Sequence, residues 1–396
     1  MISQKTLFLN LLAQTTQAPL LLEIERADGV VLYGTHGEQY LDLISGISVS
    51  SLGHGNKAVI NAIEEQAHKY LHLMVYGELV LTPQVKLAEV LSQFLPFKDQ
   101  TSVFFTNSGS EAIEGAMKLA KRATGRAEII ALKNAYHGST HGAISLSADP
   151  YYTDFYRPLL PQMRQIKQNS IEDLDYITTD TAAVFVETIM GEAGYLPSNQ
   201  EWLKELRNRC TQSGALLVLD EVQCGMGRSG TLFAFEQYEI QPDILVLAKA
   251  FGAGMPLGAF ISNKETMSVL STNPILGHIS TFGGHPVSCA AALAGFVEIT
   301  ERKLWQNAKE IEREFRSGLM HPALQQITGR GAMLGIELPT QVKCLEFVQH
   351  SIESGVLIDW FLYAPHKVRL SPPLVINSSE IRQACEIMNN VAEKIF

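Results

Sequence analysis

The sequence has few cysteines, and none is arranged for a metal site or a disulfide framework. Five cysteines are scattered over 396 residues, and no two of them form a Cys-x-x-Cys pair. We therefore expect no bound metal and no disulfide-stapled secreted fold, and the pattern favours a reducing, cytoplasmic location.

Long apolar runs and an excess of positive charge are also missing. Lys and Arg number 31 against 41 Asp and Glu, which gives a formal net charge of −10. We expect no membrane span and no surface for nucleic acid or anionic lipid. The apolar stretch at residues 5–13 is interrupted by Asn10 and lacks a clear cleavage site, so it favours an amphipathic helix over a signal peptide.

Short apolar segments alternate with helical patterns through the middle of the chain. Strands are predicted at residues 103–106, 129–132, 182–186, 216–219 and 244–247. Strands that alternate with helices predict an α/β fold with a mostly parallel sheet flanked by helices.

The two ends of the chain have a different character. Residues 30–44 predict a hairpin that turns at 35–37. One long helical pattern at 296–319, short strands at 333–338 and 367–370, and a final helix from Glu380 predict a smaller α+β domain. We expect an N-terminal segment (1–45) that packs with the small domain, a large domain (46–295) and a small C-terminal domain (296–396).

Two apolar runs end in a single charged residue followed by a glycine-rich turn. The first ends at Asp220 and the second at Lys249. A desolvated lysine favours the neutral amine, which can attack an aldehyde. A buried acid needs a cation, and the protonated ring nitrogen of pyridoxal phosphate (PLP) is such a cation. Neighbouring strand ends with these two groups indicate a PLP site.

Further candidates follow other strands. Ser108, Gly109 and Ser110 open a helix after a strand, which suits a phosphate. Tyr136 offers an aromatic face to a planar ring, and Thr281 offers a hydroxyl to a phosphate. Taken singly, each has an ordinary explanation as a helix cap, a core residue or a turn residue. The same holds for Glu192 and Arg369, which alone favour a surface salt bridge.

Seven segments in order resemble the class III (ω-amino) aminotransferases of PLP fold type I, and in particular the acetylornithine and ornithine branches. The resemblance covers most of the chain, from about Gly29 to Ile376. Its motifs are Asn-Ser-Gly-Ser-Glu-Ala (107–112), Tyr-His-Gly-Ser-Thr (136–140), Glu-Thr-Ile-Met-Gly-Glu-Ala-Gly (187–194), Leu-Asp-Glu-Val-Gln-Cys-Gly-Met-Gly-Arg (219–228), Leu-Ala-Lys-Ala-Phe-Gly-Ala-Gly-Met-Pro (247–256), Ser-Thr-Phe-Gly-Gly-His-Pro (280–286) and Val-Arg-Leu-Ser-Pro-Pro-Leu (368–374).

The resemblance implies a role for each matching residue. Lys249 matches the Schiff-base lysine that also carries the proton, Asp220 the partner of the ring nitrogen, and Gln223 the contact to the phenolic oxygen. Ser108, Gly109 and Ser110 match the phosphate-binding cup, and Tyr136 matches the residue that stacks on the ring. Thr281 matches a threonine that reaches the phosphate in the partner subunit, which implies a homodimer with shared active sites. Arg369 matches the arginine for the carboxylate of glutamate and 2-oxoglutarate, and Glu192 matches the acid that pairs with it.

The implied reaction transfers an amino group from an ω-amino donor of the acetylornithine or ornithine type to 2-oxoglutarate, giving an aldehyde and glutamate. Ser139 departs from the pattern, because those branches carry arginine there for the donor's α-carboxylate. Lysine, 4-aminobutyrate or a diamine as donor and pyruvate as acceptor therefore stay open, as do a decarboxylase or an aminomutase of the same fold. A non-catalytic PLP-carrying regulator is disfavoured because Lys249 and Asp220 are both kept. A plain nucleotide-binding protein is disfavoured because the phosphate-loop and dinucleotide fingerprints are absent.

Overall fold

The computed structural model describes residues 3–97, 100–147 and 149–396. A seven-stranded sheet has the order β4-β12-β11-β10-β7-β5-β6. Its strands are β4 (Thr101–Thr106), β5 (Glu128–Leu132), β6 (Met163–Ile166), β7 (Thr181–Val186), β10 (Leu216–Asp220), β11 (Ile244–Leu247) and β12 (Gly258–Asn263). The five predicted strands are thus confirmed.

Strand β12 is the exception to the parallel arrangement of this sheet. It pairs antiparallel with both β11 and β4, whereas the pairs β10–β11, β10–β7, β5–β7 and β5–β6 are parallel. The prediction of a mostly parallel sheet is confirmed, although β12, which lies between β4 and β11, was not predicted.

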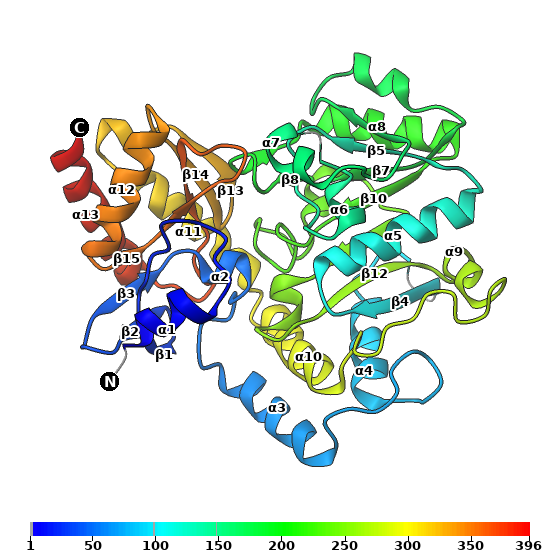
Figure 1. The fold of residues 1–396 in the computed structure, drawn as a ribbon, viewed down its shortest axis with the longest axis horizontal. Helices are drawn as coiled ribbons and strands as arrows, with labels where there is room; N and C mark the ends of the chain where they lie inside the picture. The colour runs from blue at the N-terminus through cyan, green and yellow to red at the C-terminus, as the bar shows by residue number, and fades with distance from the viewer. Residues whose placement is uncertain (1–2, 98–99, 148) are drawn as a thin grey trace.

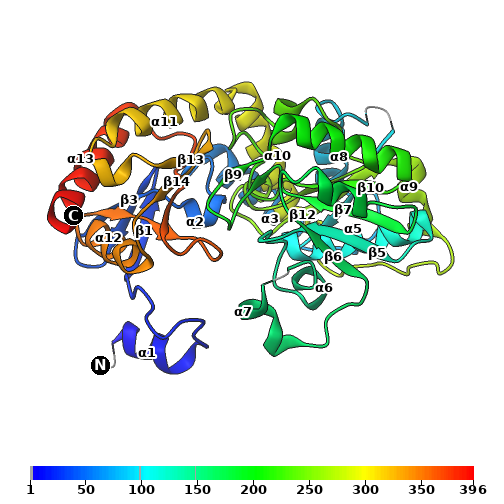
Figure 2. The ribbon, with the colours of Figure 1, turned by 90° about the horizontal axis from the view of Figure 1, so that it is seen from above.

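Helices cover both faces of the large sheet (Figure 2). On one face, Ile113 and Met117 of α5 (Gly109–Thr124) share a core with Val218 of β10. On the other face, Trp202 of α8 (Gln200–Ser213) shares a core with Leu217. Alternate residues of β10 therefore enter opposite cores, as expected for a strand that is buried on both sides.

The N-terminal strands join the C-terminal part of the chain. Strands β1 (Ile24–Asp28), β2 (Val31–Gly34) and β3 (Gln39–Asp42) form antiparallel pairs, and β3 pairs in parallel with β15 (Val356–Leu357). Figure 1 shows these blue strands beside the orange and red elements. A second four-stranded sheet has the order β13-β14-β17-β16, from β13 (Ile327–Arg330), β14 (Met333–Glu337), β16 (Asp359–Trp360) and β17 (Lys367–Leu370).

The predicted long helix at 296–319 is wrong in one respect, because two helices occupy it. Helix α10 (Pro286–Glu301) ends, and α11 (Leu304–Gly318) begins, on either side of Lys303. Lys303 has a φ of 50°, in the left-handed region that a continuous helix cannot contain. The domain boundary expected at residue 295 falls inside α10. The division of the chain into an N-terminal segment and two domains, at residues 45 and 295, stays a prediction.

The termini are helical. Helix α1 (Gln4–Leu11) has no buried residue, and α13 (Ser378–Ile395) closes the chain with a capping box at Asn377. The remaining helices are α3 (Lys57–Lys69), α4 (Thr82–Ser92) and α12 (Gln341–Glu353), with short turns α2 (Ser45–Ser48), α6 (His141–Ile144), α7 (Pro150–Thr153) and α9 (Lys264–Ser268). Within the described part of the chain, no helix is both long enough and apolar enough to cross a membrane.

Candidate active site

A cavity of about 400 Å³ lies at the carboxyl ends of β4, β5, β7, β10 and β11. This is the edge at which open α/β sheets bind ligands. Seven of the predicted site residues line it: Ser108, Gly109, Ser110, Tyr136, Asp220, Gln223 and Lys249.

Lys249 lies two residues beyond the end of β11 and begins a single 3-10 turn. Its φ of 52° is unusual for a residue with a side chain, and strain of this kind is concentrated at functional sites. Burial lowers the pKa of the Lys249 amine, and only part of this effect is offset by the charge of Glu192. A larger share of the amine is therefore neutral, which is the nucleophilic form.

Asp220 is the last residue of β10, and both of its oxygens are held. Oδ1 accepts a hydrogen bond from the Val222 N–H at 2.9 Å, and Oδ2 lies 2.7 Å from His137 Nδ1. Burial opposes protonation of His137, but the hydrogen bond to Asp220 and its charge outweigh burial and raise the His137 pKa. These two contacts fix the orientation of the carboxylate at the edge of the cavity.

Sequence reasoning missed His137 as a site residue. Its ring is buried, and Nε2 has no hydrogen-bond partner among the described residues. The sequence indicated it only through its position in the motif at residues 136–140, between Tyr136 and Gly138.

The turn from β4 into α5 forms a cradle of small residues. Ser108 caps α5, and its Oγ accepts a hydrogen bond from the Glu111 N–H at 3.2 Å. Gly138 has a φ of 129°, and a Cβ added there would lie 2.2 Å from Ser110 Oγ. Only glycine permits this close approach between the loop after β5 and the start of α5.

Glu187 supports Tyr136 from the end of β7. Its Oε1 accepts from the Tyr136 N–H at 3.0 Å, and its Oε2 accepts from the Gly191 N–H at 2.9 Å. Burial raises the Glu187 pKa. Sequence reasoning did not select Glu187, although it opens the motif at 187–194.

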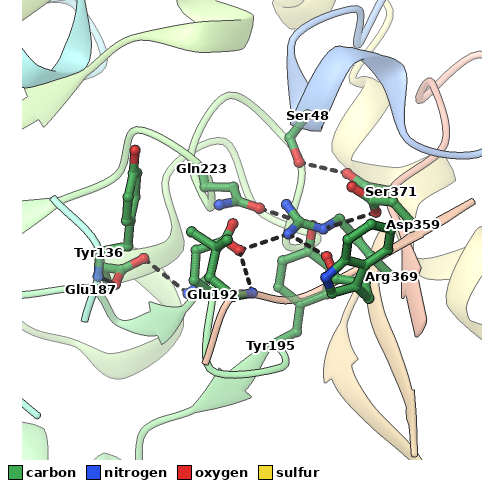
Figure 3. A network of polar contacts seen from close by, with 12 residues as sticks. Ser48, Tyr136, Glu187, Glu192, Tyr195, Gln223, Asp359, Arg369 and Ser371 are labelled. Carbon is green, nitrogen blue, oxygen red and sulfur yellow. Dashed lines mark hydrogen bonds and ion pairs between the residues drawn. The ribbon is translucent and has the colours of Figure 1, made fainter. Parts of the chain in front are cut away.

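Glu192 and Arg369 form a buried ion pair beside the cavity (Figure 3). Arg369 Nη2 lies 2.7 Å from Glu192 Oε2, and Nε lies 3.2 Å from Asp359 Oδ1. Burial alone would raise the Glu192 pKa, but the charge and hydrogen bond of Arg369 lower it below its ordinary value. Arg369 comes from β17, and Glu192 comes from the turn between β8 (Ile189–Met190) and β9 (Leu196–Pro197), far apart in the sequence.

Glu192 also holds the chain around residue 362. Its Oε2 accepts from the Leu362 N–H at 3.2 Å, and its carbonyl accepts from the Tyr363 N–H at 3.1 Å. A rotation of the Glu192 side chain would release both Arg369 and Leu362.

Of the two predicted residues that remain, Gln223 lines the cavity and Thr281 does not. Gln223 Oε1 accepts from the Tyr195 hydroxyl at 2.9 Å, next to Arg369 in Figure 3. Thr281 is exposed and does not line the cavity of its own chain. The structure therefore brings together every predicted site residue except Thr281.

The residues of the cavity fit PLP. The start of α5 offers backbone N–H groups and hydroxyls for the phosphate, Asp220 offers a carboxylate for the ring nitrogen, and Lys249 offers an amine for the aldehyde. Metal ions have no comparable site, because no group of three His, Cys, Asp or Glu within residues 3–97, 100–147 and 149–396 is placed to hold one.

Comparison with known proteins gives consistent matches. The model of the family "Aminotransferase class-III" matches residues 12–392. The acetylornithine aminotransferase of Clostridium acetobutylicum is 36% identical over 378 residues, covering 92% of this chain and 94% of that protein. That of Gloeobacter violaceus is 37% identical over 394 residues, covering 96% and 95%.

Solved structures agree with these matches. The ornithine aminotransferase of Toxoplasma gondii, described with partial occupancy of PLP at its active site, superimposes with a TM-score of 0.90 at 28% identity, covering 98% of this chain and 93% of that one. The comparisons confirm the predicted family, fold type and cofactor.

Glu221, next to Asp220, gives a testable pH dependence. Its carboxylate points away from the cavity and accepts from the Ala234 N–H at 2.8 Å and the Phe235 N–H at 2.7 Å. Burial raises the pKa of Glu221 from about 4.5 to about 8. The folded protein therefore keeps a proton that the unfolded chain releases in this range, so stability falls as the pH rises towards 8.

We expect Glu221→Gln to flatten the dependence of the free energy of unfolding on pH between pH 5 and 8, measured by urea titration. Glu205→Gln is the control, because the Arg209 hydrogen bond lowers the Glu205 pKa and places its contribution below this range. Equal slopes for Glu221→Gln and the unaltered protein would contradict the prediction.

Proposed function

Because the chain belongs to the class III aminotransferases, which depend on PLP, we propose that it takes the amino group of an ω-amino donor and passes it to 2-oxoglutarate. The products would be an aldehyde and glutamate. The observation that carries this proposal is the meeting of Lys249 and Asp220 in one cavity, beside the Glu192–Arg369 pair.

When bound, the cofactor supplies an aldehyde that accepts and returns the amino group and a ring that draws electrons from the reacting carbon. Asp220, fixed by His137, holds the proton on the ring nitrogen. Lys249, with its lowered pKa, carries the proton to and from the donor carbon that bears the amine. Ser108, Gly109 and Ser110 would hold the phosphate, Gln223 would contact the phenolic oxygen, and Tyr136 would stack on the ring.

The Glu192–Arg369 pair supports the use of two unlike substrates at one site. While Glu192 pairs with Arg369, the charge of the guanidinium group is neutralised. A donor that has no carboxylate next to its reacting amine can then approach. When Glu192 turns away, Arg369 binds the carboxylate of glutamate or 2-oxoglutarate bidentately. Arg369 Nη1 is available to donate such a hydrogen bond, because it has no hydrogen bond to a described residue.

A homodimer is the proposed active unit. Thr281 lies outside its own cavity, and large apolar side chains near it are exposed, at 78% for Ile275 and 54% for Phe282. Large exposed apolar side chains close together on the surface favour a protein–protein interface. Pairing of two chains through this loop would bring Thr281 to the partner's phosphate site.

The names of the relatives favour an acetylornithine- or ornithine-type donor, whereas Ser139 stands where those branches carry arginine. Pyruvate as acceptor, another ω-amine as donor, and a decarboxylase or an aminomutase remain the alternatives. Release of glutamate equal to the donor consumed, without carbon dioxide, would separate the transaminase from the decarboxylase.

The central test is the cofactor absorbance and activity of Lys249→Ala. We expect loss of the absorbance band of the covalently bound cofactor near neutral pH and a fall in kcat of roughly 1000-fold or more. The variant lacks the amine that binds the cofactor aldehyde and that transfers the proton. Lys249→Arg is the matched control, since it keeps the charge and cannot attack the aldehyde, and it should be equally inactive. Activity retained by either variant would reject the proposed role.

Removal of Glu192 tests the substrate exchange. We expect Glu192→Ala to lower the ratio of kcat/KM for an ω-amine to that for glutamate by about tenfold, because Arg369 is no longer neutralised. Glu192→Gln keeps an acceptor for the Leu362 N–H but not the charge, so a similar change in both variants assigns the effect to charge. An unaltered ratio in both would contradict the exchange.

Complementation tests the shared site. Thr281→Ala is expected to weaken cofactor binding and Lys249→Ala to abolish activity, yet hybrid dimers of the two should recover one intact site each. Refolding or subunit exchange of the mixed variants, followed by assay at a cofactor concentration that leaves the Thr281→Ala homodimer largely unloaded, measures this recovery. No recovery in isolated hybrid dimers would place Thr281 in its own subunit's site or in none.

A further inference from the structure

A second cavity of about 340 Å³ adjoins the proposed active site. It shares Tyr136, His137 and Gly138 with the first cavity, and its outer wall carries Tyr152, Tyr156 and Tyr363. A donor whose amine lies at Lys249 would extend its distal part past Tyr136 into this space.

Charged side chains are missing from this wall. Among its described lining residues there is no Lys, Arg, Asp or Glu, and Ser139 occupies the position next to Gly138. His137 lines the cavity too, but its Nδ1 faces Asp220 at 2.7 Å and its side chain has no exposed surface, so it offers no contact to a ligand. His141 Nε2 lies 2.9 Å from the Pro158 carbonyl, which it can contact only as a donor.

Three tyrosine hydroxyl groups of the wall are already engaged. Tyr136 pairs with Ser139 Oγ at 2.9 Å, Tyr363 pairs with Ser147 Oγ at 3.1 Å, and Tyr152 donates to the Leu362 carbonyl at 2.9 Å. Burial raises the pKa of Tyr363 to about 12, so this phenol is neutral at physiological pH. The wall thus presents ring faces and satisfied hydroxyls.

A carboxylate placed in this cavity would lose water and contact no exposed cation, which is costly, because the side chain of His137 has no exposed surface. An ammonium group would find no carboxylate in the wall. Tyr152 and Tyr363 instead meet edge to face, with ring centroids 5.2 Å apart, and form an aromatic surface that suits an apolar or aryl group.

From this wall we propose that the amino donor is a primary amine whose distal part is uncharged, an alkyl or aryl group that rests against Tyr152 and Tyr363. The inference rests on the proposed transaminase function. It also assigns Ser139 as a determinant of donor choice, because its short side chain leaves the cavity open and without a cation.

The first test compares matched donors on the purified holoenzyme with 2-oxoglutarate, and with pyruvate if that acceptor is used. We expect kcat/KM for hexylamine or 2-phenylethylamine to exceed that for 6-aminohexanoate, 1,6-diaminohexane and N-acetylornithine by at least tenfold. A charged donor that equals or exceeds both uncharged amines would overturn the inference.

Bleaching of the cofactor absorbance separates the two possible failures. If charged donors bleach it and uncharged amines do not, the transaminase function stands and the inference about the donor falls. If no amine in the set bleaches it, the proposed function falls, and the inference falls with it.

The second test places a cation in the cavity. Ser139→Arg should raise kcat/KM for 6-aminohexanoate relative to hexylamine by at least tenfold, whereas Ser139→Gln, similar in length but neutral, should leave that ratio within about threefold. The cofactor absorbance of both variants shows that the first cavity is intact. A ratio that does not respond to the arginine, or responds equally to the glutamine, would overturn the assignment of Ser139.

Discussion

The parallel pairing of β10 with β11 is the constraint on which the site depends. Asp220 lies opposite Val246, and the Glu221 N–H donates to the Val246 carbonyl at 2.9 Å. This register leaves Lys249 three residues beyond Val246, at the same edge of the sheet as Asp220. A slip of one residue would turn alternate side chains of β10 into the opposite core and remove the acid from the cavity. Both strands are buried on both faces. Their packing therefore fixes the separation between Asp220 and Lys249.

Two buried charged groups of the site, Asp220 and Arg369, are compensated by residues from other elements. Asp220 at the end of β10 meets His137 from the loop after β5. Arg369 on β17 meets Glu192 from the turn between β8 and β9 and Asp359 on β16. Buried ions without such partners would cost several kcal/mol each. The loops at the sheet edge are therefore tied to one another by the same interactions that set the chemistry.

The Glu192–Arg369 pair links the two cavities. Glu192 neutralises Arg369 and at the same time holds the Leu362 N–H, and Leu362 with Tyr363 forms part of the second cavity's wall. Movement of one side chain would thus alter both the cation available to a carboxylate and the wall that contacts the donor. A site that accepts unlike substrates in turn needs such a coupled change, because it must present different charge to each of them.

The sequence by itself determined the positions of five strands of the large sheet, the family and the residues at the ends of those strands. Asp220 and Lys249 end apolar runs, and that pattern is local, so it can be read from the order of residues alone. The tertiary structure decided what depends on contacts between distant segments: the antiparallel place of β12, the break in the helical pattern at Lys303, and the roles of His137 and Glu187 behind Asp220 and Tyr136. It also decided that Ser139 faces an aromatic cavity without a cation, because Tyr152 and Tyr363 reach that wall from segments more than 200 residues apart. Hydrogen bonds and burial between such segments follow from the packing of the whole chain, and no local pattern of residues encodes them.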